Sequence, residues 1–539
     1  MIITTYSIAV RIITINIFIT AYIILAFTDD IRYRRIFMPF FGNATAVCEV
    51  IFLKNNSSAT ESAEISGSPN EEAARLRELF GGSCDLTLKN MSVRTHQGER
   101  SVLVASMEGL CDKELMTVSV INRIAEYVPT QHESDVYTQL FRSMITCCDV
   151  KTVTTLGEAA RLIMSGFALV FVSGSRKAAA VGVQGYAFRG IDEPQTEVLQ
   201  RGSREGFTEP IKLNQALIRR RLKTGALVFE PMQVGMTDVC LCYLRGTAPQ
   251  QLVELARQRL QSAGLEAVYT AGCLVEYLED GGSSLFNGVG VTERPDTACA
   301  KLCEGKIAVI CDGTPSVLIV PHLMTENFST LDDYSDRPYF ATMTRWLKYA
   351  AFLISVTLPG LYVALASYSP EFFPSQLLTR VTTSISKTPF SAFSEVLLFT
   401  FIYEIMREAG LRLPKTLGHA VSIIGGLVIG DTAVSSGFIG APTLMIVALT
   451  VICSYVIPDL YAPIAALRFL FILFGGMWGI WGIVLMFCAM IADLCAKESF
   501  GVPFMLPVAP AEPSGFRDVL VRAPWRVLAR RKFVAGGEA

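Results

Sequence analysis

The sequence predicts an α/β or α+β soluble region followed by an α-helical membrane region with several spans. Two observations support this fold class. First, 51% of the 539 residues are hydrophobic and only 18% are charged, a composition unusual for a soluble globular protein. Second, the apolar residues are unevenly distributed: apolar and charged residues alternate over about 57–345, whereas long apolar runs recur over about 349–495.

We expect four segments along the chain. They are a divergent hydrophobic leader with a flexible linker (1–72), a cytoplasmic α/β domain (73–340), a transmembrane domain of four to six spans (341–500) and a basic cytoplasmic tail (501–539). If the soluble domain consists of two subdomains, the composition places their division near 210–225.

The first 27 residues are apolar and long enough to span a bilayer, which requires about 20 residues. Arg11 interrupts this stretch, and no small-residue cleavage site of a signal peptide follows it. Three interpretations remain open: an N-terminal span or anchor, a leader that results from an upstream start, and a pair of soluble core strands. Residues 54–72 are rich in Ser, Asn and Glu and predict a flexible linker.

Strands and helices alternate in the soluble region. We expect a strand and the start of a helix over 101–116, a helix over 159–166, two strands around a Gly-Ser turn over 166–183, two amphipathic helices over 249–280, and two strands around a Gly-Pro turn over 305–321. This alternation predicts an α/β or α+β domain.

The membrane region contains five apolar stretches, near 349–367, 391–406, 419–436, 438–457 and 468–494. The second carries Glu395 and Glu404, and each carboxylate would cost about 2.5 kcal/mol or more if it faced lipid at mid-depth. Arg468 is a further intramembrane charge, and for these three side chains both salt bridging across spans and pore lining remain open. The last stretch is long, and its glycines Gly475, Gly476, Gly479 and Gly482 permit close helix packing or a kink.

Basic residues at the span ends predict the orientation. Arg345 and Lys348 precede the first span and place the soluble domain in the cytoplasm. The tail is also strongly basic, so the number of crossings should be even. Because we count five candidates, one of them must be re-entrant, interfacial or split.

The sequence argues against catalysis. It has no GxSxG, HExxH or GxxxxGK[ST] motif, and its four histidines are far apart. The fourteen cysteines form no paired CxxC array, which favours reduced structural thiols over a metal site. A net charge of −2 argues against a nucleic-acid binder. We therefore expect no enzyme activity, no cofactor and no metal.

The stretch 193–222 carries many opposite charges around a glycine-containing turn. They are Arg201, Arg204, Arg219, Arg220 and Arg221 together with Glu193, Glu197, Glu205 and Glu209. Such arginines can bind a phosphate or a carboxylate. Because acids and bases are nearly matched, we favour a charge network that fastens a loop to its own domain or to a neighbouring subunit.

The stretch "GGLVIGDTAVSSG" (425–437) carries a carboxylate, Asp431, followed by Thr432, within an apolar span. Gly426 and Gly430 form a GxxxG pair, which permits close approach of another helix. A carboxylate at this depth faces a bundle interior or water, so several copies would form a ring of negative charge, with Val428 as an apolar constriction. The alternative is that the glycines only pack helices and that Asp431 caps a helix end or pairs with Arg468.

Five further motifs occur in order along the chain: "RGSREGFTEP", "MTDVCLCYLRGTAP", "TERPDTACAKLCEGKIAVICDGTPSVLIVP", "DDYSDRPYF" and "REAGLRLPKTLGHAVSIIGGLVIGDTAV". Together they resemble the A subunit of the GerA-type spore germination receptors. The resemblance extends over about 80–526, does not cover 1 to about 60, and "REAG" favours a nutrient-receptor A subunit over the SpoVAF-like proteins.

This resemblance implies a protein of the spore inner membrane with a cytoplasmic N-terminal domain. It would act with a transporter-like B subunit, taken to bind the nutrient, and a lipoprotein C subunit. Its copies would oligomerise into a nutrient-gated ion channel, and no covalent chemistry is implied. The alternatives are a SpoVAF-like protein that modulates ion release, a secondary transporter and a scaffold subunit.

Overall fold

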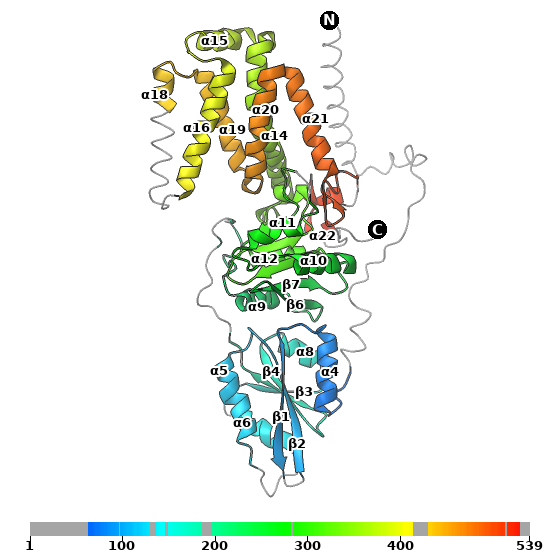
Figure 1. The fold of residues 1–539 in the computed structure, drawn as a ribbon. Coiled ribbons are helices and arrows are strands. Elements are labelled where there is room, and N and C mark those ends of the chain that lie inside the picture. Colours follow the sequence, from blue (N-terminus) through cyan, green and yellow to red (C-terminus); the bar gives the residue numbers. More distant parts are fainter. Residues whose placement is uncertain are drawn as a thin grey trace, which may run out of the picture. The chain divides into compact units, whose positions relative to one another are not determined.

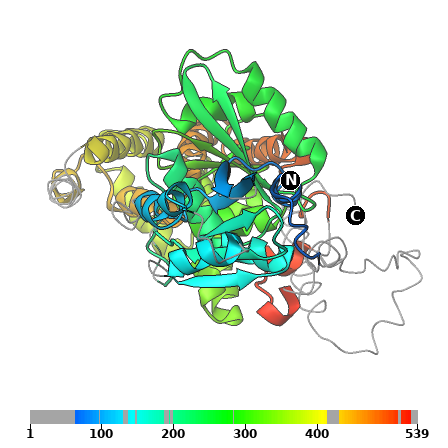
Figure 2. The ribbon, with the colours of Figure 1, turned by 90° about the horizontal axis from the view of Figure 1, so that it is seen from below.

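The structure, a computed structural model, describes residues 63–95, 98–128, 136–145, 149–185, 194, 197, 199, 201–281, 284–412, 430–511 and 515–528. Elements of two β-sheets come first along the chain, coloured blue to green, and a region of helices follows, coloured from yellow-green to red (Figures 1 and 2). The expectations for the hydrophobic leader lie outside the described residues.

The end of the predicted linker is folded. Helix α4 (Pro69–Leu79) begins within it, and Glu72 on this helix is fully buried. The backbone N–H of Ile65 donates to the carbonyl of Thr154 at 3.2 Å. The prediction of a flexible linker was therefore wrong for residues 63–72, because a polar composition does not reveal a partner that lies far away in the sequence.

The first sheet has the strand order β1-β2-β4-β5-β3, and all neighbouring strands are antiparallel. Its strands are β1 (Leu86–Thr95), β2 (Gly98–Met107), β3 (Val150–Val153), β4 (Phe167–Val172) and β5 (Ala178–Gly182), and its helices besides α4 are α5 (Lys113–Met116), the π-helix η2 (Thr117–Ile121), α6 (Asn122–Ala125), α7 (Val136–Ile145) and α8 (Leu156–Ile163). Leu169 and Phe171 of β4 pack with α4 and α8, whereas Ala168 and Val170 pack with α6 and α7. The alternation of side chains along a strand thus supplies both faces of this sheet with a core.

The second sheet has the order β6-β7-β9-β10-β8 and is also antiparallel throughout. Its strands are β6 (Leu227–Val234), β7 (Thr237–Leu244), β8 (Gly290–Thr292), β9 (Ile307–Cys311) and β10 (Val317–Val320), and its helices are α9 (Ile211–Arg221), α10 (Gln250–Ser262), the 3-10 helix η3 (Ala271–Leu274), α11 (Val275–Leu278) and α12 (Pro295–Cys303). Ile307 and Val309 pack with α10 and α11, whereas Ala308 and Ile310 pack with α9 and α12.

The two sheets repeat one topology. In each, the third strand along the chain lies at an edge beside the fifth, and the fourth and fifth strands form a hairpin. The hairpin turns contain Gly174 and Gly313, with φ of 87° and 81°, a backbone conformation that favours glycine. Because every pair of neighbouring strands is antiparallel, the soluble region is α+β, the second of the two predicted classes.

The helical region follows the second sheet. Its elements are η4 (Met324–Phe328), α13 (Asp332–Ser335), α14 (Pro338–Tyr368), η5 (Pro370–Phe372), α15 (Ser375–Ile385), α16 (Ala392–Arg412), α18 (Gly430–Ser435), α19 (Ala441–Tyr455), η7 (Pro458–Leu460), α20 (Tyr461–Trp478) and α21 (Ile480–Ala496), and the chain continues into β11 (Glu498–Ser499), β12 (Val502–Pro503), η8 (Gly515–Asp518) and α22 (Trp525–Leu528). Within the described residues, the helices over Pro338–Tyr368 and Pro458–Trp478 are long and apolar enough to cross a membrane, and Ala441–Tyr455 and Ile480–Ala496 are shorter apolar helices.

The predicted apolar stretch over 468–494 consists of two helices, so it has the interruption that the sequence left open as a kink or a split span. Gly479 separates α20 from α21 with φ 61° and ψ −140°, a backbone conformation open to glycine alone. The hydroxyl of Tyr368, at the end of α14, donates to the carbonyls of Gly476 (2.7 Å) and Met477 (3.1 Å). Tyr368 thereby satisfies carbonyls that the end of α20 leaves free.

Gly475 permits close contact between α14 and α20. A methyl group on its Cα would lie 2.6 Å from the carbonyl oxygen of Gly360, so the two helices meet at backbone distance. Gly479, in contrast, ends a helix.

The predicted span over 419–436 lies partly outside the described residues, which begin again with α18.

Candidate functional site

Arg468 of α20 is 1% exposed and reaches two other helices. Its Nε donates to the carbonyl of Ser355 on α14 (3.2 Å), and its Nη1 lies 3.5 Å from Oε1 of Glu404 on α16. Glu404 also accepts from the hydroxyl of Tyr461 (2.7 and 2.9 Å) and from Nε of Arg407 (3.2 Å). The structure thus brings two of the predicted intramembrane charges together, and each has the partner that a charge among apolar helices requires.

Glu395 of α16 is completely buried and has no basic partner among the described residues. Its Oε2 accepts from the hydroxyl of Thr443 (2.8 Å) and lies 3.4 Å from the backbone N of Gly440. Gly440 and Thr443 form the start of α19, and the hydroxyl of Tyr362 on α14 lies 3.2 Å from that of Thr443. The carboxylate therefore sits at the positive end of α19, where a negative charge is stabilised.

Asp431 and Thr432 lie on α18 and are exposed. Arg468 pairs with Glu404, so the alternative in which Asp431 pairs with Arg468 is not the arrangement found. Within the described part of the chain, Asp431 has no hydrogen-bond or ion-pair partner. Gly430 is buried, but a methyl group there would make ordinary contact with Leu444 of α19 at 3.6 Å. Gly426 and Val428 lie outside the described residues.

Arg219, predicted as part of a charge network, joins the two sheet regions. Its guanidinium bonds to Asp85 (2.7 and 3.0 Å) and to the hydroxyl of Ser83 (3.1 Å), and Arg219 and Asp85 are 0% and 3% exposed at the side chain. Ser83 also accepts from the backbone N of Phe229 in β6 (3.0 Å), and the ring of Phe229 lies 5.0 Å from the guanidinium carbon. Asp85 precedes β1, so the contact links residues 134 positions apart, and no motif in the sequence indicated it.

The other predicted charges form a more exposed group. Arg220 and Arg221 both pair with Glu205, with 2.7 Å between Arg221 Nη2 and Glu205 Oε2. Partial burial acts to raise the pKa of Glu205, but the hydrogen bonds and charges of the two arginines outweigh it and lower that pKa below its usual value. Arg204 and Glu209 are exposed. Glu193 lies outside the described residues.

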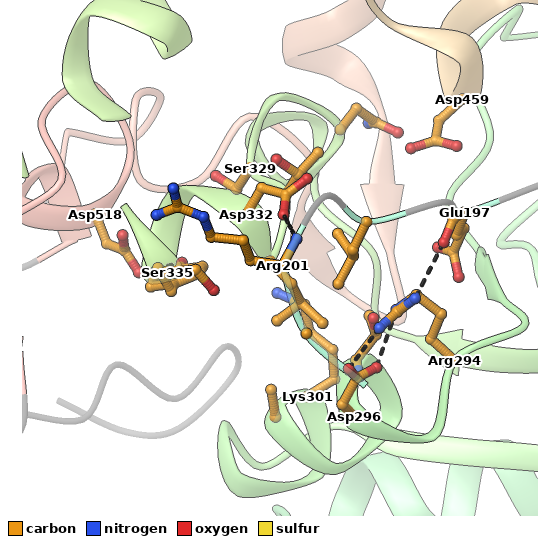
Figure 3. A pocket seen from close by; sticks show the side chains of 18 of the residues that line it. Glu197, Arg201, Arg294, Asp296, Lys301, Ser329, Asp332, Ser335, Asp459 and Asp518 are labelled. Atoms are coloured by element: carbon orange, nitrogen blue, oxygen red, sulfur yellow. Dashed lines mark hydrogen bonds and ion pairs between the residues drawn. The ribbon is translucent and has the colours of Figure 1, made fainter. Parts of the chain in front are cut away.

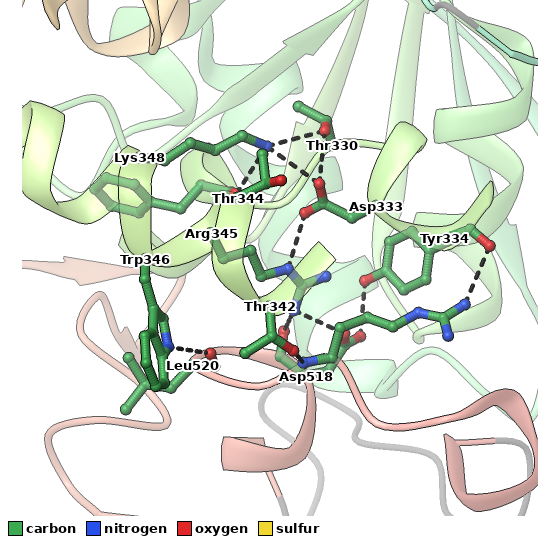
Figure 4. Close-up of polar contacts among 12 residues, drawn as sticks. Thr330, Asp333, Tyr334, Thr342, Thr344, Arg345, Trp346, Lys348, Asp518 and Leu520 are labelled. Atoms are coloured by element: carbon green, nitrogen blue, oxygen red, sulfur yellow. Dashed lines mark hydrogen bonds and ion pairs between the residues drawn. The ribbon is translucent and has the colours of Figure 1, made fainter. Parts of the chain in front are cut away.

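A buried ion network that the sequence did not predict lies at the start of α14 (Figure 4). Arg345 bonds to Asp333 (2.8 Å) and to Asp518 of the tail (3.0 Å), and Lys348 bonds to Asp333 (3.3 Å). Arg345 is 0% and Asp333 3% exposed. The indole N–H of Trp346 donates to the carbonyl of Leu520 (2.8 Å). In the sequence, Arg345 and Lys348 indicated only the orientation of the chain in the membrane. Their spacing of three residues, which places both on one helix face, was the available sign that they share a partner.

A cavity of about 660 Å³ lies beside this network (Figure 3). Six parts of the chain line it: the segment around Glu197 and Arg201, α12, the segment 327–335, Lys348 of α14, the turn before α20 and the tail. Glu197 and Arg201 belong to the predicted charge group, whereas Asp459 of the turn was not singled out. Burial above all, and the nearby charge of Asp459, raise the pKa of Glu197 to about 7.

No three His, Cys, Asp or Glu side chains gather into a possible metal site in the part of the chain that the structure describes. The buried charges act on one another and on helix ends, and they hold helices and domains together.

The comparisons with known proteins identify the family. The model of the Bacillus/Clostridium GerA spore germination protein family matches residues 74–534. The chain belongs to this family. The resemblance expected from the sequence motifs is thereby confirmed, and a role related to spore germination follows from it.

Two relatives of this GerA-family chain come from Bacillus subtilis (strain 168). Spore germination protein KA is 35% identical over 466 residues, which are 86% of this chain and 85% of that protein. The uncharacterized membrane protein YfkQ is 37% identical over 402 residues, 74% of this chain and 78% of that protein. Among solved structures, the N-terminal domain of the A subunit of the Bacillus megaterium spore germinant receptor GerK3 matches with 24% identity and a TM-score of 0.37, over 49% of this chain and 98% of that chain.

Proposed function

We propose that the chain is the A subunit of a nutrient germinant receptor in the spore inner membrane, with its sheet regions in the cytoplasm. Membership of the GerA family and the 35% identity to spore germination protein KA over most of both chains support a receptor subunit. The two helices long and apolar enough to cross a membrane support a membrane location. A transporter-like B subunit and a lipoprotein C subunit complete the proposed receptor.

We further propose that copies of the chain assemble into a ring that conducts ions when the nutrient binds. The observation that carries this proposal is the contrast between Asp431 and the other charges of the apolar segments. Glu395, Glu404 and Arg468 have partners within the chain, whereas Asp431 is exposed on α18 and has no partner among the described residues. A carboxylate in an apolar segment requires water or polar neighbours, and a ring of copies around a wet axis supplies both.

The network at the start of α14 supplies a route from the sheet regions to the helices. Asp333 precedes α14 and Asp518 belongs to the tail, and both hold Arg345. Lys301 and Lys306 of the second sheet region pair with Glu326 in the segment before α14, so a shift of that region would act on the start of α14. Because α14 and α20 are in backbone contact at Gly360 and Gly475, such a movement would reach the other helices.

Charge reversal at Asp431 tests the ion path. In spores that carry Asp431→Lys, a ring of positive charge would repel cations, so we expect nutrient-triggered cation release to fall at least tenfold while the copy number of the purified protein stays unchanged. The matched control is Glu408→Lys, at an exposed position near the end of α16 (51% exposed at the side chain), which should release cations normally. Normal release in Asp431→Lys spores would refute the ion path. A monomeric protein with intact transport would favour the secondary transporter, and a ring without conductance would favour the scaffold.

A further inference from the structure

The cavity beside the α14 network has the size and the walls of a small-molecule site. Its volume of about 660 Å³ falls in the range of about 300–1,000 Å³ that is usual for ligand pockets. Apolar side chains form much of its wall: Leu199, Leu331, Val456, Pro458, Trp525 and Leu528. Such a site holds an organic molecule with an apolar body, provided that a polar group of the cavity is free to orient it.

The basic groups of the cavity are already paired. Arg294 bonds to Asp296 (2.7 Å) and Lys301 to Glu304 (3.0 Å), and Lys348 is bonded within the α14 network. A ligand would have to displace an internal carboxylate to reach any of these three cations.

Arg201 is the more available cation. Its side chain is 77% exposed, and its Nη1 lies 3.6 Å from Asp336. An exposed pair of this kind contributes little free energy. Arg201 lines the cavity, but in Figure 3 its guanidinium points toward Ser335 and Asp518, away from Glu197 and Asp459.

Two carboxylates of the cavity form no ion pair with a described residue. Glu197 uses Oε2 to accept from the hydroxyl of Thr292 (2.6 Å) and the backbone N of Glu293 (3.0 Å), and no described group bonds to its Oε1. Asp459, in the turn before α20, has no hydrogen-bond or ion-pair partner among the described residues, and Lys348 of the same cavity is near enough to act on its charge. Two carboxylates near each other in a partly enclosed site repel one another, and a cation between them removes that repulsion.

We propose that this cavity binds a small organic molecule through its ammonium group, with Glu197 and Asp459 as the acceptors. A primary amine and an amino acid both carry such an ammonium group. The apolar walls select an organic ammonium over a bare metal ion. Because Glu197 lies beside the second sheet and Asp459 lies between α19 and α20, the bound molecule would tie the sheet region to the apolar helices. This site goes beyond the proposed channel and does not depend on it.

Binding to the purified full-length protein in detergent tests the site, with three probes that share one apolar body. L-valine carries both charged groups, isobutylamine lacks the carboxylate, and 3-methylbutanoate lacks the ammonium group. By isothermal titration, we expect isobutylamine and L-valine to bind and 3-methylbutanoate not to bind. Equal affinities for the two binders would assign the site to amines. A tenfold higher affinity for L-valine than for isobutylamine would assign it to amino acids.

The double variant Glu197→Gln with Asp459→Asn keeps the shapes of both side chains and removes both charges. We expect it to lower the affinity for isobutylamine at least tenfold. It should remain folded, because the repulsion between the carboxylates is also removed, so its thermal unfolding midpoint without ligand should be at least as high as that of the unaltered protein. The matched control is Glu304→Gln, at a cavity carboxylate already paired with Lys301, which should keep the affinity within twofold. Unchanged affinity in the folded double variant, or no binding of either ammonium probe to the unaltered protein, would overturn the proposal.

Discussion

Three of the buried arginines among the described residues each hold together parts of the chain that are distant in sequence. Arg219 and Arg345 are 0% exposed and Arg468 is 1% exposed. Their partners are Asp85, the pair Asp333 and Asp518, and Glu404. A buried guanidinium requires such partners, because an unpaired charge in a region of low dielectric costs several kcal/mol.

Removal of one charge from the joint between the sheet regions should therefore be costly. Arg219→Met keeps an apolar stem but leaves Asp85 buried without its partner, and we expect the free energy of unfolding to fall by about 3–5 kcal/mol. The control Arg412→Met removes an arginine whose side chain is 79% exposed in its pair with Glu408, and it should change the same quantity by less than about 1 kcal/mol. Chemical denaturation of the purified chain measures both. If both variants changed the free energy of unfolding equally, Arg219 would not stabilise the contact between the two sheet regions.

Glu197 makes the stability depend on pH. Its pKa in the folded protein is about 7, above its ordinary value of 4.5, so the folded state binds this proton more tightly than the unfolded state. Stability is therefore lost as pH rises from 4.5 to 7 and stays low above 7. We expect the thermal unfolding midpoint to fall between pH 5 and pH 8, and Glu197→Gln should make that fall smaller. Identical profiles for the two proteins would contradict the raised pKa.

Single residues also show the limit of sequence reasoning. The motifs pointed to Arg219, Arg220 and Arg221 as charged neighbours on one helix, yet Arg219 turns inward to Asp85 and the other two pair with Glu205. Consecutive residues of a helix point in different directions, about 100° apart. The composition identified the charges, but only the fold supplies partners that lie 134 residues away.

At the scale of elements, a glycine divides the last apolar stretch into α20 and α21. Hydropathy alone predicted a single apolar stretch, because both helices are apolar and the turn between them is short. Gly479, one of four glycines in this stretch, marks the boundary between the two helices. Hydropathy does not distinguish a glycine that packs against another helix from one that ends its own helix. The other apolar stretches were easier to predict, since α14 and α19 coincide with long uninterrupted apolar runs.

Gly479→Ala tests this turn. An alanine at φ 61° and ψ −140° is strained, and its methyl group would lie 3.1 Å from the ring of Tyr368. We expect the thermal unfolding midpoint of the helical region to fall, with a cost of about 1–3 kcal/mol or more. The control is Gly264→Ala, because Gly264 has no described atom within 4 Å and an ordinary φ; it should behave as the unaltered protein. A stable Gly479→Ala protein would mean that the two helices join in another way.

Some strands of the soluble region were predictable from the sequence because their pattern is local. The hairpins β4–β5 and β9–β10 are short apolar runs around a glycine turn, a local pattern that the sequence displays directly. The order of strands within each sheet was not predictable, because β3 and β8 reach their places only through contacts that are distant in the sequence. The alternative α/β or α+β therefore stayed open until the antiparallel pairings decided it.

At the scale of the whole molecule, buried charges connect the described parts in series. Arg219 joins the first sheet region to the second, Arg345 joins the tail to the start of α14, and Arg468 joins α14, α16 and α20. Asp431 has no place in this series and faces outward from α18. In the proposed assembly its surroundings are other copies of the chain and water.

The most direct test of this account asks whether Asp431 faces a water-filled path. The Asp431→Cys protein is reconstituted into liposomes and treated with a positively charged thiol reagent that does not cross membranes. The unaltered protein is the control for the natural cysteines. Glu408→Cys is the control for an exposed position outside the path. We predict that the reagent modifies Asp431→Cys, as seen by mass spectrometry, and reduces its cation flux several-fold while the controls keep theirs. Full modification of Asp431→Cys with unchanged flux, or no modification at all, would contradict the account.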